Sequence, residues 1–169
     1  RNHSSAASDV YKRQGWNNLG RIYQKGKKLD SALAFYGNAI DADNAYVSAY
    51  INRAILLTQL GRNEEALEDF NQAISLDRGD EWPYINRGVL YEQMQNQQAA
   101  MADYNRALKI SVTNALAYKY RGVLKFEMGD LTDAFDDLSE AISLNPDFGA
   151  AWYCRCLLYT SPSPRDIGE

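Results

Sequence analysis

Adjacent carboxylates are the residues of this chain that come closest to a catalytic arrangement. They occur twice, at Glu64-Glu65 and at Asp136-Asp137. Both pairs lie in stretches with helical hydrophobic spacing, and neighbouring residues of a helix point about 100° apart. Neither pair can therefore converge on one substrate atom as a general acid–base pair must. Solvated helix surface, with negative charge near a helix N-terminus, is the better interpretation.

The rest of the chain offers no other catalytic constellation. Between Gly15 and Arg155 the sequence has no histidine, no glycine–serine nucleophile elbow and no glycine-rich phosphate loop. Cys154 and Cys156 have the spacing of half a metal site, but no second pair and no histidine accompany them. We therefore expect no catalytic residues, no metal and no cofactor, and a chain that is not an enzyme.

One pair of sequence positions carries opposite charges in three successive units of 34 residues. The pairs are Arg53 and Asp69, Arg87 and Asp103, and Arg121 and Asp137. In the preceding unit the same positions hold Leu19 and Phe35, so both positions change together. We predict an ion pair within each charged unit and an apolar contact between Leu19 and Phe35, because a partly buried arginine favours a bidentate carboxylate partner. Two independent surface columns are the alternative interpretation.

The elements that position these charges repeat along most of the chain. Three columns show the same step of 34 residues: Ala32, Ala66, Ala100 and Ala134; Ala39, Ala73, Ala107 and Ala141; and the aromatic residues Trp16, Tyr50, Tyr84, Tyr118 and Trp152. A fixed period of this length is typical of stacked supersecondary units, none of which can bury its apolar face alone. Function is then expected from a recognition surface and not from a reaction centre.

Each unit contains two helical patterns. In the second unit, apolar residues at three- and four-residue steps predict helices over 47–60 and 63–76. Gly61 stands where a chain that leaves a helix often takes a positive φ, and Asn63 is the expected N-cap of the next helix. The dipeptide Gly129-Asp130 repeats this arrangement two units later.

Small residues form a column on the first helix of each unit, opposite large residues on the second helix. The small residues are Gly20, Ala54, Gly88 and Gly122, and the large ones are Tyr36, Phe70, Tyr104 and Leu138. Small side chains let two helices approach closely, while the large ones fill the space beside them. Each unit is therefore expected to be an antiparallel helix hairpin.

The first unit carries a family pattern: Trp16-x-x-Leu19-Gly20-x-x-Tyr23, then Ala32, Tyr36 and Ala39. This pattern resembles the tetratricopeptide repeat (TPR), and the resemblance covers residues 13–155. It implies an all-α fold, a right-handed α-solenoid of antiparallel helix hairpins, with four full repeats (13–46, 47–80, 81–114 and 115–148) and the first helix of a fifth (149–160). The proline that usually closes a repeat occurs only as Pro146.

Both ends of the chain lose the period. Residues 4–14 resemble the read-through translation of a transposase-type sequencing adapter, and residues 156–166 resemble the reverse complement of its partner oligonucleotide. We therefore interpret residues 1–14 and 161–169 as non-native and disordered segments around a repeat domain at 15–155. A last helix is predicted over 148–160.

The family resemblance also implies where a partner binds, because the inner surface of such a solenoid is lined by the first helices. The expected peptide-binding residues are Asn17, Arg21, Ile51, Asn52, Ile55, Ile85, Asn86, Val89, Lys119, Val123 and Phe126. Asparagine at 18, 52 and 86 can donate to and accept from an extended peptide backbone. In the alternative interpretation, the isoleucines pack between helices and the asparagines bond within the scaffold.

The resemblance implies a protein–protein interaction scaffold that binds peptide or helical segments of partner proteins. A recognition arm of a larger enzyme and a purely structural solenoid are the alternatives. With a formal net charge of −4 and no basic cluster, we expect no nucleic-acid partner. No apolar run approaches the roughly 20 residues that span a membrane, so no membrane contact is expected either. The incomplete fifth repeat also predicts self-association.

The family's clamp for chaperone C-terminal tails uses lysine, asparagine and arginine. Five positions of this chain correspond to that clamp: Asn17, Arg21, Asn52, Trp82 and Asn86. Only Asn52 matches in kind, so the resemblance does not extend to this ligand.

Overall fold

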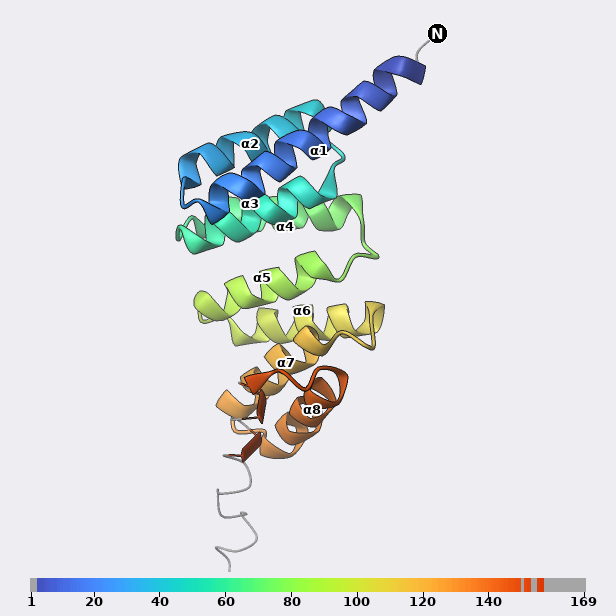
Figure 1. The fold of residues 1–169 in the computed structure, drawn as a ribbon. Coiled ribbons are helices and arrows are strands. Elements are labelled where there is room, and N and C mark those ends of the chain that lie inside the picture. Colours follow the sequence, from blue (N-terminus) through green and yellow to red (C-terminus); the bar gives the residue numbers. More distant parts are fainter. Residues whose placement is uncertain (1–2, 150, 153–154, 157–169) are drawn as a thin grey trace, which may run out of the picture. The chain divides into compact units, whose positions relative to one another are not determined.

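A computed structural model of the chain describes residues 3–149, 151–152 and 155–156. Within them it contains eight α-helices and no strand, which confirms the all-α solenoid class (Figure 1). The helices are α1 (His3–Lys25), α2 (Leu29–Ala42), α3 (Val47–Gln59), α4 (Asn63–Leu76), α5 (Trp82–Gln93), α6 (Gln97–Ile110), α7 (Ala115–Glu127) and α8 (Leu131–Leu144). Helices α1 and α2 pack as a hairpin, and so do α3 with α4 and α7 with α8.

The chain divides into two compact units, Arg1–Leu90 and Tyr91–Glu169. The first unit holds α1 to α4 and most of α5. The second holds the end of α5 and the helices α6 to α8. The expected single repeat domain over 15–155 stays a prediction.

The turn inside each hairpin follows one backbone pattern. Gly61 and Gly129 have φ of 72° and 84°, as the sequence predicted for Gly61. The same position holds Lys27 and Gln95 in the other two hairpins, and both take a positive φ, 56° and 59°. The left-handed region is therefore required by the turn itself, even where the residue is not a glycine.

The predicted helix limits in the second repeat agree with α3 and α4, but the predicted cap does not. Arg62 occupies the N-cap position, and Asn63 is the first helical residue. Arg62 caps with no side-chain hydrogen bond, and neither does Asp130 before α8. Asparagine does cap elsewhere: Asn96 accepts from the backbone nitrogen of Ala99 at 3.1 Å. The Gly-to-helix connection is one residue shorter than the sequence suggested.

Both alanine columns are buried where the helices meet. Their eight members have no exposed surface. The carbonyls of the second column also accept the backbone N–H that closes each second helix, from Asp43, Asp77, Ser111 and Asn145. Alanine at these points satisfies a helix end while a neighbouring backbone approaches closely.

The small column on the first helices is also a packing requirement. A Cβ atom on Gly20 would lie 2.5 Å from Cε1 of Tyr36, and one on Gly122 would lie 2.9 Å from Cγ of Leu138. Cβ contacts below 3.0 Å essentially never occur. The two glycines therefore set how closely the helices of their hairpins approach.

A further column joins each repeat to the one before it. Leu56 is fully buried with Ala32 and Tyr36 of the preceding hairpin. Leu90 is buried in the same way with Ala54 and Phe70, and Leu124 is fully buried as well. The first member of the column, Ile22, is 62% exposed.

The expectation of disorder before Gly15 is wrong. Helix α1 begins at His3, so the adapter-like residues continue the first repeat helix backwards. At its inner end, Arg13 pairs with Asp43 and its guanidinium carbon lies 5.1 Å from the centre of the Tyr46 ring. These contacts anchor the continuation to the second hairpin's entrance.

At the other end, residues 149, 151–152 and 155–156 are helical, and Ala151 is buried with Leu138 and Ile142. The remainder of the predicted helix over 148–160 and the predicted tail over 161–169 lie outside the described residues.

Candidate functional site

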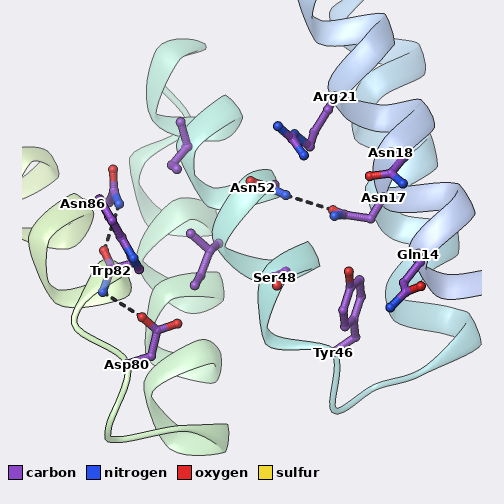
Figure 2. Close-up of a pocket in the computed structure, with 12 residues that line it drawn as sticks. Gln14, Asn17, Asn18, Arg21, Tyr46, Ser48, Asn52, Asp80, Trp82 and Asn86 are labelled. Carbon is purple, nitrogen blue, oxygen red and sulfur yellow. Dashed lines mark hydrogen bonds between the residues drawn. The ribbon is translucent and has the colours of Figure 1, made fainter. Parts of the chain in front are cut away.

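The first unit contains a cavity of about 590 Å³ beside the first helices of its repeats. Its lining comes from α1, α3, the start of α5 and the loops before α3 and α5 (Figure 2). The lining residues are Gln14, Asn17, Asn18, Arg21, Tyr46, Ser48, Ile51, Asn52, Ile55, Asp80, Trp82 and Asn86. We call this cavity the amide groove, because five of these side chains are carboxamides.

The amide groove brings together six of the eleven residues that the sequence singled out. They are Asn17, Arg21, Ile51, Asn52, Ile55 and Asn86. Ile85 is only 2% exposed and belongs to the core, and Val89 is half-buried without lining the groove. A peptide-binding role for these residues stays a prediction.

The other three expected residues, Lys119, Val123 and Phe126, belong to the second unit and are half-buried. The Lys119 Nζ atom lies 4.1 Å from the centre of the Tyr120 ring and 5.2 Å from that of Phe148. Burial lowers the pKa of this lysine. Val123 packs against the core cluster of α8.

Several asparagines of the groove bond within the scaffold. Asn52 Nδ2 donates to Asn17 Oδ1 at 2.9 Å, and Asn86 Nδ2 donates to the carbonyl of Trp82 at 2.8 Å (Figure 2). Asn17 is 5% exposed. Among the described residues, the Asn17 amide nitrogen and the Asn52 amide oxygen make no hydrogen bond. The Asn17–Asn52 pair thus offers one donor group and one acceptor beside each other.

The groove residues that the sequence analysis left out lie at the entrances of the helices. Tyr46 and Asp80 are counterparts one period apart, and so are Gln14, Ser48 and Trp82. Continuing the groove-facing columns one turn toward the helix N-termini identifies all five. That signal is the period itself.

A second cavity of about 400 Å³ adjoins the groove and shares Arg21, Asn52 and Ile55 with it. It extends toward the hairpin turn, where Gln24, Lys25, Tyr36 and Gln59 line it. The Tyr36 hydroxyl donates to Gln24 Oε1 at 2.7 Å, and Gln24 Nε2 donates to Gln59 Oε1 at 3.2 Å. The carboxamide surface therefore continues along α1 and α3.

Comparison with known proteins assigns the family. Two family models match: a TPR repeat model over residues 56–95, and a tetratricopeptide repeat model over residues 14–46 and 83–111. The chain is a tetratricopeptide repeat protein. None of the curated proteins compared with this TPR chain matches it.

Solved structures show the same fold. PilF of Pseudomonas aeruginosa superposes with a TM-score of 0.84 at 15% identity, over 90% of this chain and 70% of PilF. A tetratricopeptide repeat protein of Parabacteroides merdae gives 0.74 at 27% identity, over 89% and 59% of the two chains. The first TPR of Spaghetti (RPAP3), solved with the HSP90 peptide SRMEEVD, gives 0.66 at 27% identity, over 70% and 96%.

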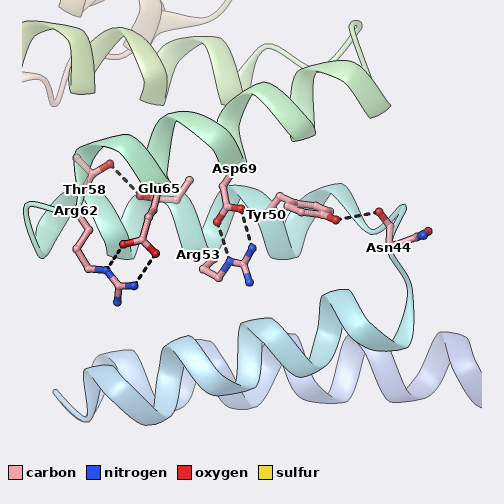
Figure 3. Close-up of polar contacts among 8 residues, drawn as sticks. Asn44, Tyr50, Arg53, Thr58, Arg62, Glu65 and Asp69 are labelled. Atoms are coloured by element: carbon pink, nitrogen blue, oxygen red, sulfur yellow. Dashed lines mark hydrogen bonds and ion pairs between the residues drawn. The ribbon is translucent and has the colours of Figure 1, made fainter.

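Two of the predicted ion pairs of this TPR chain are confirmed. Arg53 Nε and Nη2 donate to the two carboxylate oxygens of Asp69 at 2.7 and 2.8 Å (Figure 3). Arg121 makes the same bidentate contact with Asp137, at 2.7 and 2.6 Å. The hydrogen bond to Asp69 raises the pKa of Arg53. The third predicted pair, Arg87–Asp103, spans the two compact units and stays a prediction.

The arginines of the TPR chain also reach back to the preceding repeat. Arg121 Nη1 donates to Asn105 Oδ1 at 2.8 Å, and Arg87 donates to the equivalent Asn71. Each guanidinium additionally lies over the aromatic ring three residues earlier, 5.9 Å for Arg53 over Tyr50. One arginine thus joins two repeats, a role that the sequence analysis missed.

In the first TPR repeat the paired positions are apolar, but their contacts differ from the expected one. The Phe35 ring stacks on Trp16 at 5.7 Å between ring centres and meets Tyr23 at 4.7 Å. Leu19 is half-buried, and its predicted contact with Phe35 stays a prediction.

The second unit of the TPR chain repeats the hairpin-turn arrangement with carboxylates. Glu92 and Glu127 stand where the first unit has Gln24 and Gln59, and both line a cavity of about 440 Å³. The Tyr104 hydroxyl donates to Glu92. Burial raises the pKa of Glu92, the hydrogen bond from Tyr104 lowers it, and the charge of Glu127 raises it.

None of the helices that the structure describes is long and apolar enough to cross a membrane. Within the same residues, no group of three or more histidine, cysteine, aspartate or glutamate side chains is arranged to hold a metal ion.

Proposed function

We propose that the amide groove binds an extended peptide segment of a partner protein. Stacked helical repeats form interaction scaffolds whose concave surfaces serve recognition and not catalysis. In this chain the groove combines the two features that such binding needs: carboxamides that can pair with a peptide backbone, and the apolar side chains of Ile51 and Ile55.

The Asn17–Asn52 pair is the observation that carries this proposal. Its hydrogen bond fixes both side chains, and it leaves a donor and an acceptor next to each other at the groove. A peptide backbone unit presents the complementary acceptor and donor. Because the two amides are already ordered, little side-chain entropy is lost when a peptide binds.

The Spaghetti (RPAP3) repeat shows that a related domain binds a peptide, the HSP90 segment SRMEEVD. The present groove differs from the family's tail clamp, because Trp82 and Asn86 stand at two of its cationic positions. The partner we propose is therefore a different peptide from the chaperone tail.

A peptide library screened against the full chain tests the proposal, with affinities measured by fluorescence anisotropy. Asn52→Ala removes the exposed acceptor and the support of Asn17, and it should weaken the selected peptides about tenfold. Asn38→Ala, an exposed asparagine of α2, is the matched control and should leave affinity unchanged. If no peptide binds, or if both variants behave alike, the groove is not the binding site.

A further inference from the structure

The amide groove carries opposite charge at its two ends. At one end lie Arg21 and Lys25, which are one helical turn apart on α1 and line the adjoining cavities. Both are exposed, and neither has an ion pair or hydrogen bond among the described residues. At the other end Asp80 lines the groove beside Trp82, whose backbone N–H donates to Asp80 Oδ1 at 2.9 Å.

Neighbouring charges strengthen the acidic end. Burial raises the pKa of Asp80, and the negative charges of Glu81 and Asp77 raise it further, which shows that three carboxylates share this corner. The nearest cation at that end of α1 is Arg13, and Arg13 is already paired with Asp43. The corner around Asp80 therefore keeps a net negative charge.

The two ends are far enough apart to address different residues of one ligand. Asp80 is the counterpart of position 12, two periods earlier, and Arg21 lies nine residues beyond that position. Nine helical residues correspond to roughly 13 Å along the helix direction. An extended peptide covers about 3.3 Å per residue, so the two contacts require ligand residues that are about four or more positions apart.

We infer that the amide groove selects peptides of one polarity, with an acidic residue placed at Arg21 and Lys25, an aliphatic residue over Ile51 and Ile55, and a basic residue at Asp80. This inference rests on the proposed peptide-binding function. Complementary charges fix the direction and register of a ligand more than they add to its affinity. The reversed peptide would place like charges at both ends, which is the repulsive element that specificity requires.

Charge-swap variants of the full chain provide the test. The best peptide from the library is measured against the wild-type chain, Arg21→Glu and Asp80→Lys. We expect Arg21→Glu to weaken binding about tenfold or more, and exchange of the peptide's acidic residue for lysine to restore it. Asp80→Lys should behave in the same way toward exchange of the basic residue for glutamate.

Two exposed residues outside the groove match these changes in charge. Lys109→Glu and Glu140→Lys should leave binding unchanged. The inference is overturned if peptides bind the wild-type chain but neither compensating exchange restores affinity, or if the reversed peptide binds equally well. Peptide binding itself then stands. If no peptide binds the wild-type chain, the proposed function and the inference both fail.

Discussion

Gly20 lies so close to Tyr36 that a Cβ atom on the glycine would be 2.5 Å from Cε1 of the ring. The ring cannot easily move away, because the Tyr36 hydroxyl donates to Gln24 at 2.7 Å. In the next repeat the equivalent positions hold Ala54 and Phe70, which share one core cluster. The polar anchor and the glycine therefore belong together.

Gly20→Ala is expected to destabilise the chain by about 1–3 kcal/mol, because the added methyl group overpacks the hairpin. Tyr36→Phe in the same chain removes the anchor and recreates the arrangement of the second repeat, so it should recover part of the loss. Urea denaturation of the single and double variants measures this. Equal stability of Gly20→Ala and the wild-type chain would contradict the close approach.

Arg53 and Asp69 should show coupled contributions to stability. Asp69 is buried at 6% exposure and is held by two charge-assisted hydrogen bonds. Asp69→Ala leaves a partly buried arginine without its partner, and we expect a loss of about 2 kcal/mol in the free energy of unfolding. The double replacement Arg53→Leu with Asp69→Phe imitates the first repeat and should cost less than that single change.

A double-mutant cycle provides the measurement, with Arg53→Leu completing the four chains. Additive losses, with no coupling energy, would show that the two residues contribute independently. Arg62 and Glu65 form an exposed pair in the neighbouring helix turn, at 2.7 and 2.6 Å, and serve as the control (Figure 3). Their coupling should be small, as for most surface pairs.

Lys27 and Gln95 occupy a turn position that glycine fills in the other two hairpins. A non-glycine residue in the left-handed region is strained, and glycine offsets part of this gain because its unfolded state is more flexible. Lys27→Gly should therefore stabilise the chain by roughly 0.5–1 kcal/mol. The reverse exchange, Gly61→Lys, should destabilise it, and thermal unfolding compares the two. A loss of stability in Lys27→Gly would contradict the role of the turn.

Glu92 should make the stability of the chain fall as the pH rises. Its pKa in the folded chain lies above the usual carboxyl value of 4.5, first because it is buried and also because Glu127 repels its charge. The folded state then binds the proton more tightly than the unfolded state. The free energy of unfolding therefore decreases as the pH rises from the unfolded pKa through the folded one, and the loss is complete above it.

Glu92→Gln, which imitates Gln24, should raise stability at neutral pH and flatten this part of the pH profile. Denaturation between pH 4 and pH 8 gives both quantities. Glu140→Gln, at an exposed site of α8, is the control and should follow the wild-type profile. An unchanged slope in Glu92→Gln would show that another group causes the dependence.

The period determined what could be predicted from the sequence. Positions that repeat every 34 residues share one environment, so the burial of the alanines, the limits of α3 and α4 and the Arg53–Asp69 pair followed from the sequence alone. The groove-facing columns identified six residues that do meet in one cavity.

The missed features depend on geometry between repeats or on residues outside the period. Asn105 gave no signal because its partner, Arg121, already had a charged counterpart in its own repeat. The cap before α4 was misplaced by one residue because the turn after Gly61 uses Arg62 without a side-chain bond. The helical state of residues 3–14 could not be derived from a period that they lack.

Ile22 and Leu56 occupy the same column, yet one is 62% exposed and the other is fully buried. An apolar side chain at this position contributes to stability only when another hairpin covers it. Replacing Ile22 with a charged residue should therefore improve solubility at little cost, whereas the same replacement at Leu56 would separate two neighbouring hairpins. Tolerance to substitution in such an array depends on the place of the repeat in the row, and not on the residue type alone.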